Sequence, residues 1–126
     1  MSQLVPLGAV AHFGIAVLDP AASADWWASR FNVEVFARSD ARVVLGNDAV
    51  VFSLFKGRPD PTVLSHLAFR AKDMPSLLAA RDALRDAGVD LEDPGDEIGP
   101  VAEGSPSMGL WFHDVDGYRW ELYVRG

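Results

Sequence analysis

The sequence contains no cysteine among its 126 residues. Disulfide bonds, thiolate metal sites and cysteine nucleophiles are therefore excluded, and any transition metal would have to be bound through His, Asp, Glu or water. Histidine is scarce as well, because His12, His66 and His113 are the three that the chain contains. Any imidazole ligand for a metal must come from these three side chains.

Long apolar runs and basic charge are also lacking. No apolar stretch approaches the roughly 20 residues that a membrane-spanning helix needs, and 11 Lys and Arg stand against 18 Asp and Glu, a net charge of -7. Binding to nucleic acid or anionic lipid needs a concentrated basic surface, so we expect neither partner. Residues 1–4 form neither a basic leader nor a cleavage site, which favours the cytoplasm. We expect a soluble globular protein with one core.

One pattern occurs twice along the chain. His12 and His66 each open a strand-like segment that ends at an aspartate, Asp19 or Asp73, and a helical pattern follows each aspartate. Each helical pattern leads to a short strand and then to a hairpin. In the first copy these segments are 12–18, 20–30, 33–36, 42–45 and 49–55, and in the second they are 66–72, 74–87, 89–91, 108–113 and 118–124.

This repetition predicts an α+β fold, with two tandem βαβββ modules forming a curved mixed sheet. We expect module 1 at about 8–56, a linker rich in proline and glycine at 57–63, and module 2 at about 64–126, all within one domain. The acidic stretch 92–107, rich in glycine and proline, is long for a loop in a compact domain. It fits a lid over a binding site and a surface insertion equally well.

Alternation along the strands predicts which side chains share a face. In the first strand of each copy the apolar rows exclude the histidine, so His12 and His66 point away from the core in matching phase. In the last strand Trp120 and Leu122 belong to the apolar row, which leaves Glu121 on the opposite face. The two histidines and the glutamate are therefore expected on the side of the sheet away from the helices.

The turn 114–117 fixes the register of the second hairpin. Its sequence Asp-Val-Asp-Gly suits a type I turn followed by a left-handed glycine and a bulge. With that bulge Phe112 faces Trp120, and on the other side Trp111 lies opposite Glu121 and His113 opposite Arg119. We prefer this register because it pairs apolar residues with apolar residues.

Two imidazoles and one carboxylate on separate strands form a donor set that leaves open positions on a divalent ion. We therefore predict a metal bound by His12, His66 and Glu121, with Fe(II), Mn(II), Zn(II) or Ni(II) as the ions considered. His113 beside Arg119 is open to two interpretations, a role in proton transfer or substrate contact and a plain exposed pair.

The chain resembles the vicinal oxygen chelate superfamily, which includes glyoxalases, extradiol dioxygenases, fosfomycin-resistance transferases and bleomycin-resistance proteins. The resemblance spans nearly the whole chain and rests on the paired modules, on the leading histidines and on the ending 112–122, which is similar to the family's aromatic, Asp-Pro-Asp-Gly and Glu-Leu signature with Val115 in place of proline. It implies modules that curl around a metal, a small substrate that chelates the metal through neighbouring oxygens, and a homodimer whose subunits could share the site.

Departures from the family pattern bear on the activity. A glyoxalase or epimerase would be expected to supply a fourth ligand near Ser53, where this chain has no carboxylate or amide. Ring-cleaving dioxygenases use three such ligands but usually carry a tyrosine where Trp111 stands, so His113 or Tyr123 would have to substitute. Fosfomycin-type transferases typically offer a lysine in the loop before the last hairpin, and none occurs in 101–107.

The sequence thus predicts a metal-dependent enzyme, either a ring-cleaving dioxygenase or a glyoxalase-like lyase. The expected catalytic residues are His113, Tyr123 and Arg119, and the expected substrate contacts are Trp111, as a stacking wall, and Ser53. The alternatives are a fosfomycin-type thiol transferase and a non-catalytic, bleomycin-resistance-like dimer whose acidity attracts a cationic aromatic drug.

Overall fold

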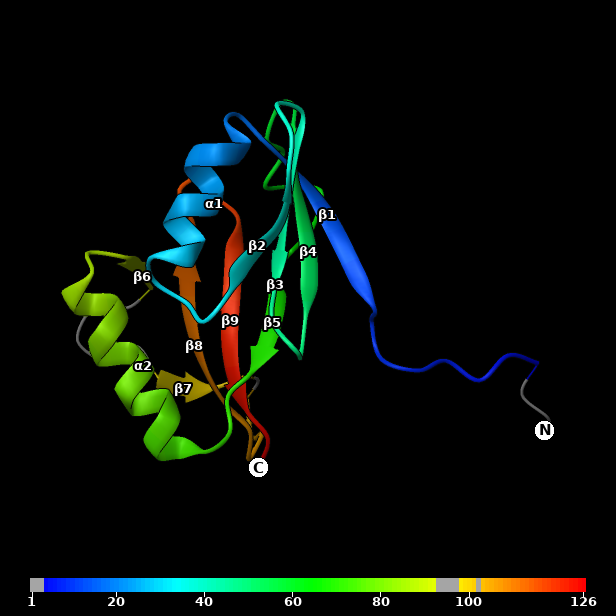
Figure 1. Cartoon of the computed structure of the whole chain (residues 1–126). Coiled ribbons are helices and arrows are strands. Elements are labelled where there is room, and N and C mark those ends of the chain that lie inside the picture. The colour runs from blue at the N-terminus through cyan, green and yellow to red at the C-terminus, as the bar shows by residue number, and fades with distance from the viewer. Residues whose placement is uncertain (1–3, 93–97, 102) are drawn as a thin grey trace. The chain divides into compact units, whose positions relative to one another are not determined.

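The computed structural model describes residues 4–92, 98–101 and 103–126. The chain divides into two compact units, Met1–Arg58 and Pro59–Gly126. Figure 1 shows their elements in chain order. Unit 1 contains β1 (His12–Val17), α1 (Pro20–Ala28), β2 (Glu34–Arg38), β3 (Arg42–Gly46) and β4 (Val51–Lys56), and unit 2 contains β5 (Leu67–Arg70), α2 (Met74–Asp86), β6 (Asp90–Leu91), β7 (Ile98–Pro100), β8 (Met108–His113) and β9 (Arg119–Val124).

The two helices begin in the same way. The Asp19 side chain caps α1 by accepting a hydrogen bond from the backbone N–H of Ala22, and Asp73 caps α2 by accepting one from Ser76. Each helix has proline in its first turn, where the backbone amide has no partner within the helix. After α2, Gly88 takes a positive φ of 73°, a conformation that glycine adopts without strain.

Unit 1 forms a four-stranded mixed sheet in the order β1-β4-β3-β2, with β1 parallel to β4. The helix α1 packs on β2, β3 and β4. Along β1 the side chains of Ile15 and Val17 are buried, while His12 and Gly14 are exposed, as the alternation predicts. The core of unit 1 consists of Ile15, Val17, Ala24, Trp27, Val43, Leu45, Phe52 and Leu54.

Unit 2 repeats this plan in a five-stranded sheet, in which four strands follow the order β5-β9-β8-β6, β7 pairs with β8 as the fifth, and β5 is parallel to β9. The helix α2 packs against β6 and β9. The core of unit 2 consists of Leu77, Leu84, Val89, Leu91, Leu110, Phe112, Tyr118, Trp120 and Leu122. The predicted α+β fold with two βαβββ modules is confirmed, and each module has its own mixed sheet.

The strand β7 pairs with β8 and lies within the stretch 92–107 that the sequence predicts as a loop. Three residues of that stretch therefore extend the sheet of unit 2 instead of forming a lid or an insertion. Residues 93–97 and 102 of the same stretch lie outside the described residues. Across the part of the chain that the structure describes, no helix is long and apolar enough to cross a membrane.

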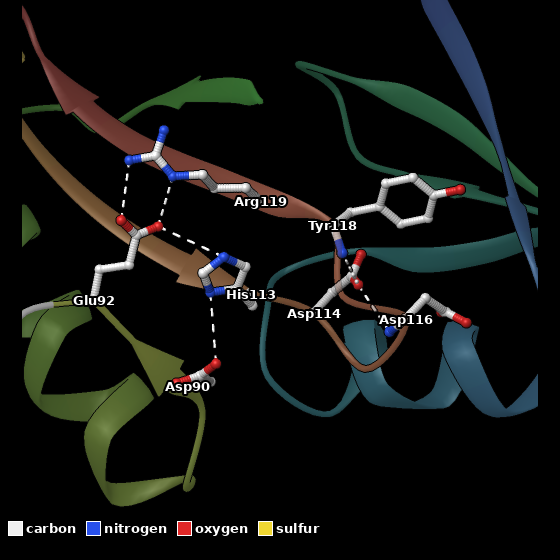
Figure 2. Close-up of polar contacts among 7 residues, drawn as sticks. All are labelled: Asp90, Glu92, His113, Asp114, Asp116, Tyr118 and Arg119. Carbon is white, nitrogen blue, oxygen red and sulfur yellow. Dashed lines mark hydrogen bonds and ion pairs between the residues drawn. The ribbon is translucent and has the colours of Figure 1, made fainter. Parts of the chain in front are cut away.

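The turn between β8 and β9 is built around the buried side chain of Asp114, which is 8% exposed. Its Oδ1 accepts hydrogen bonds from the backbone N–H groups of Asp116 and Tyr118 (Figure 2), and its Oδ2 accepts one from Trp120 Nε1 at 2.8 Å. Burial raises the pKa of the Asp114 carboxyl, and the hydrogen bonds from Trp120 and the backbone act to lower it. Gly117 has φ 90°, as the turn requires.

The predicted register of this hairpin is confirmed. Phe112 pairs with Trp120, Trp111 pairs with Glu121, and His113 pairs with Arg119. The backbone N–H of Asp114 donates to the carbonyl of Tyr118 at 3.1 Å, which closes the turn.

Replacing Asp114 with asparagine should destabilise unit 2. The amide of asparagine cannot accept through both ends, so either the turn or the indole N–H of the buried Trp120 loses its acceptor. We expect D114N to lower the free energy of unfolding by about 1–3 kcal/mol, measured by urea denaturation. The matched control is D48N, in the exposed turn of the other hairpin, and equal stability of the two variants would contradict the anchoring role.

Candidate functional site

The face of the unit 2 sheet that lies opposite the core carries the polar side chains of interest. The pairing of Trp111 with Glu121 and of His113 with Arg119 sets these four residues on one face, because side chains alternate along β8 and β9. His66 directly precedes β5, in the matching phase. These residues lie on β8, on β9 and just before β5, and β9 is the neighbour of both β8 and β5 in the sheet.

Glu121 is the buried carboxylate of this face, with 4% of the residue exposed. Its Oε2 is buried and has no hydrogen-bond partner among the residues that the structure describes. Burial raises the pKa of the Glu121 carboxyl, while the charges of His66 and Arg119 act to lower it. A carboxylate in such a position is costly unless a cation or a donor compensates it.

A glycine makes room for this carboxylate. A Cβ on Gly109 would collide with Glu121 Oε2 and would lie 3.1 Å from Val101 Cγ1. The Glu121 side chain therefore lies over the bare backbone of β8. No side chain at position 109 separates it from that strand.

His66 is oriented toward Glu121 by its neighbour in sequence. Its Nδ1 lies 2.9 Å from the hydroxyl oxygen of Ser65, and its Nε2 lies 3.9 Å from Glu121 Oε1. The second distance is too long for a hydrogen bond. An Nδ1–H that donates to Ser65 leaves the lone pair of Nε2 on the side of Glu121, the arrangement that a metal-binding imidazole uses.

Trp111 lies between His66 and Arg119. The His66 ring meets the indole edge to face, with ring centroids 4.8 Å apart. The guanidinium carbon of Arg119 lies 3.8 Å from the centroid of the Trp111 ring, a cation–π contact. Trp111 was predicted as a stacking wall for a planar ligand, and its indole is the stacking partner of Arg119.

The carboxylate of Glu92, directly after β6, holds Arg119 in place. Glu92 accepts from Arg119 Nε at 2.6 Å and from Nη2 at 3.0 Å, a two-pronged ion pair that Figure 2 shows. The hydrogen bond from Arg119 lowers the pKa of the Glu92 carboxyl, and burial opposes that effect. Glu92 follows β6, and its backbone N–H donates to the carbonyl of Trp111 at 3.0 Å.

His113 lies between two carboxylates. Its Nε2 is 3.6 Å from Glu92 Oε2, and its Nδ1 is 3.5 Å from Asp90 Oδ2 (Figure 2). Asp90 pairs with His113 across β6 and β8, so it belongs to the same face. The predicted catalytic pair His113 and Arg119 is thus joined through Glu92.

Tyr123, also predicted as catalytic, extends this face at the other end of β9. It pairs with Arg70 of β5, and the Arg70 guanidinium carbon lies 5.8 Å from the centroid of the Tyr123 ring. The contacts of Tyr123 therefore differ from those of His113, which lies near the start of β9.

The structure joins six residues of unit 2 by contacts or close charges: His66, Trp111, Arg119, Glu92, His113 and Glu121.

Unit 1 carries the other two predicted site residues, His12 and Ser53. His12 pairs with Val51, and Gly14 pairs with Ser53, so both predicted residues lie on the face of the unit 1 sheet away from its core. A Cβ on Gly14 would lie 2.8 Å from the hydroxyl oxygen of Ser53. The glycine makes room for this hydroxyl as Gly109 does for Glu121.

Ser53 is the unit 1 counterpart of Glu121. Gly14, two residues after His12, pairs with Ser53, and Ala68, two residues after His66, pairs with Glu121. The repeat therefore places a histidine in each unit but a carboxylate only in unit 2. Within the described residues, no group of three or more His, Asp or Glu is arranged to hold a metal ion.

Sequence reasoning missed Glu92, Asp90, Ser65 and Gly109. Asp90 and Glu92 alternate about Leu91, a signal for a short strand whose charged residues share a face. Ser65 directly precedes His66, and Gly109 lies two residues before Trp111 on its face. Neither position has a sequence signal that distinguishes it from a loop serine or a strand glycine.

A scan against protein families matches residues 9–122 to the Glyoxalase/Bleomycin resistance protein/Dioxygenase superfamily. The chain belongs to this superfamily. A search of curated proteins gave no match. The match to the family model confirms the resemblance to the vicinal oxygen chelate superfamily.

Several solved structures have a fold similar to that of this chain. A lactoylglutathione lyase from Agrobacterium tumefaciens is 15% identical over 94% of this chain and 95% of its own, with a TM-score of 0.74. A fosfomycin resistance protein from Listeria monocytogenes is 15% identical over 96% of both chains, with a TM-score of 0.76. An integron cassette protein from the Vibrio cholerae mobile metagenome is 17% identical over 98% of this chain and 100% of its own, with a TM-score of 0.73.

Replacing Gly109 with alanine should disturb the Glu121 side chain. The added methyl group would occupy the space of the carboxylate, so we expect G109A to lower the free energy of unfolding by about 1–3 kcal/mol in metal-free protein. The control is G99A, because Gly99 pairs with Gly109 across β7 and β8 and has open space around its Cα. Urea denaturation measures both, and a G109A variant as stable as G99A would contradict this packing.

Proposed function

We propose that the protein is a divalent-metal-dependent enzyme that acts on a small organic substrate with neighbouring oxygen atoms. The metal would be held by His66 and Glu121 of unit 2 and by His12 of unit 1. Membership of the superfamily supports this proposal, as does the listing of glyoxalase and dioxygenase activities in the superfamily's description.

The observation that carries the proposal is the state of Glu121. Within the described part of the chain its buried Oε2 lacks a hydrogen-bond partner, and its Oε1 faces His66 Nε2 across a gap of 3.9 Å. Ligand atoms lie about 2.0–2.2 Å from a metal such as zinc, so two neighbouring ligands of one ion lie about 3 Å apart, and the two side chains would have to approach each other by about 1 Å on binding it. A cation bound here would compensate the buried charge and use the lone pair of His66.

The donor set leaves room for a substrate. Two imidazoles and one carboxylate leave open positions on an octahedral ion, and the hydroxyl of Ser53, at the position equivalent to Glu121, is a weak ligand. A bound divalent ion would supply electrophilic stabilisation of negative charge that develops on substrate oxygens. Fe(II), Mn(II), Zn(II) and Ni(II) are all compatible with nitrogen and oxygen donors.

The chain's own residues would position the substrate and move its protons. His113, between Asp90 and Glu92, is the candidate to accept or donate a proton, because carboxylates face both of its ring nitrogens. Tyr123 offers a hydroxyl on the same face. Arg119 would provide fixed positive charge beside Trp111, and Ser53 would contact the substrate from unit 1.

Among the named activities, the three-donor set favours a ring-cleaving dioxygenase over a glyoxalase-like lyase. A glyoxalase-like lyase and a fosfomycin-type thiol transferase remain the alternatives, and a lactoylglutathione lyase and a fosfomycin resistance protein are among the solved structures of similar fold. Stacking of a cationic aromatic drug on Trp111 is disfavoured, which argues against a non-catalytic drug-binding protein. The guanidinium of Arg119 already lies on that ring and would repel a second cation.

Metal analysis tests the donor set. We expect protein purified without chelator to contain stoichiometric divalent metal, measured by inductively coupled plasma mass spectrometry, and we expect H12A, H66A and E121A to lose it. The matched control is S53A, which should keep its metal because a hydroxyl at that position is a weak ligand. Circular dichroism of each variant separates loss of a ligand from loss of fold. Unchanged metal in the three ligand variants would overturn the triad.

Oxygen consumption tests the reaction. With Fe(II) and a panel of catechols, a dioxygenase would consume one O₂ for each ring cleaved, and H113A should lower kcat by roughly 100-fold or more if His113 transfers the proton. Ring cleavage is followed by the absorbance of the product. No oxygen uptake across the panel would exclude the dioxygenase assignment and leave the lyase and transferase alternatives.

A further inference from the structure

Glu92 contacts two of the polar side chains on this face of unit 2, Arg119 and His113. It holds Arg119 through two hydrogen bonds and faces His113 Nε2 at 3.6 Å. Its side chain is 30% exposed, so it is partly shielded from water. In the described part of the chain no hydrogen bond or ion pair joins Glu92 to His66 or Glu121, so any influence on them acts through other side chains.

A line of three contacts runs from Glu92 to His66. The two-pronged ion pair fixes the plane of the Arg119 guanidinium, which lies over the Trp111 ring at 3.8 Å. The Trp111 ring in turn meets the imidazole of His66 with centroids 4.8 Å apart. An arginine held by a fork loses less freedom on stacking than one that is free to rotate.

Glu92 also determines which carboxylate Arg119 pairs with. Arg119 and Glu121 are two residues apart on β9 and share a face, and their charges interact. Without Glu92, Arg119 would have the buried carboxylate of Glu121 on its own face as a possible partner. An Arg119–Glu121 ion pair would compete with a metal for the same oxygens.

We propose that Glu92 is a positioning residue that holds Arg119 on Trp111, and thereby keeps His66 oriented and Glu121 free to bind a metal. This inference rests on the proposed metal site. It assigns Glu92 no contact with metal or substrate. The residue acts through Arg119 and Trp111.

The test compares Glu92→Gln with Asp90→Asn. Both variants remove one negative charge from the same cluster, but only Glu92 holds Arg119, whereas Asp90 faces His113. We expect E92Q to weaken binding of Co(II) or Zn(II) by on the order of 10-fold, as loss of an outer partner of a metal ligand does, and D90N to leave it unchanged. Competition with a chromophoric chelator gives both dissociation constants.

A second readout follows Trp111 itself in metal-free protein. With 5-fluorotryptophan incorporated, the ¹⁹F resonance of Trp111, assigned through W111F, should shift in E92Q and stay in place in D90N. R119K keeps the charge but lacks the fork, so it should weaken metal binding as E92Q does. The double variant E92Q/R119K should then show little further loss, because both changes break one linkage.

The outcomes separate the two proposals. Wild-type protein that binds no metal would overturn the proposed function, and this inference with it. Wild-type protein that binds metal, with an E92Q variant of equal affinity, would overturn the positioning role alone. Equal weakening in E92Q and D90N, or weaker binding in E92Q with an unmoved Trp111 resonance, would also overturn it, because charge loss would then be the cause.

Discussion

The turn between β8 and β9 determines what each face of the unit 2 sheet contains. The buried Asp114 gathers the backbone of the turn and the indole of Trp120, and Gly117 supplies the left-handed residue. Strand side chains alternate, so a shift of one residue would exchange the two faces. The register that results buries Trp120 in the core and directs Glu121 to the opposite side. The polar side chains of unit 2 therefore depend on the geometry of this one turn.

Much of this arrangement could be predicted from the sequence, because it follows from alternation and from turn chemistry. The repeat, the phase of His12 and His66, and the pairing of Trp111 with Glu121 are all local properties. The role of Glu92 could not be predicted in this way. Its link to Arg119 spans 27 positions and depends on a strand of two residues, too short for a periodic pattern. The strand β7 was not predicted for a similar reason, because its three residues include a glycine and a proline and form no strand pattern.

Burial of Glu121 is a free-energy cost that the fold tolerates. A buried ionised carboxylate without adequate compensation costs several kcal/mol in real proteins. Gly109 allows the carboxylate to lie against β8, while Arg119, a cation on the same face whose charge acts on Glu121, is paired with Glu92. The packing therefore keeps the charge poorly compensated although a partner is near. Such local conflict is typical of functional positions, where the missing interaction is the one that a ligand provides.

The two modules have the same backbone plan but differ at one register position, which bears on how many open positions a bound metal would have. In both units a glycine or alanine of the first strand pairs with the residue in question, Ser53 in unit 1 and Glu121 in unit 2. A carboxylate at both positions would give four protein donors and leave an octahedral ion two open positions. With serine in unit 1, the proposed set of His12, His66 and Glu121 would supply three donors and would leave an octahedral ion three open positions, enough for a bidentate substrate and one further small molecule. Under the proposed function, the selectivity of the protein for its substrate would depend on this difference between the repeats and, within unit 2, on the fixed Arg119–Trp111 pair.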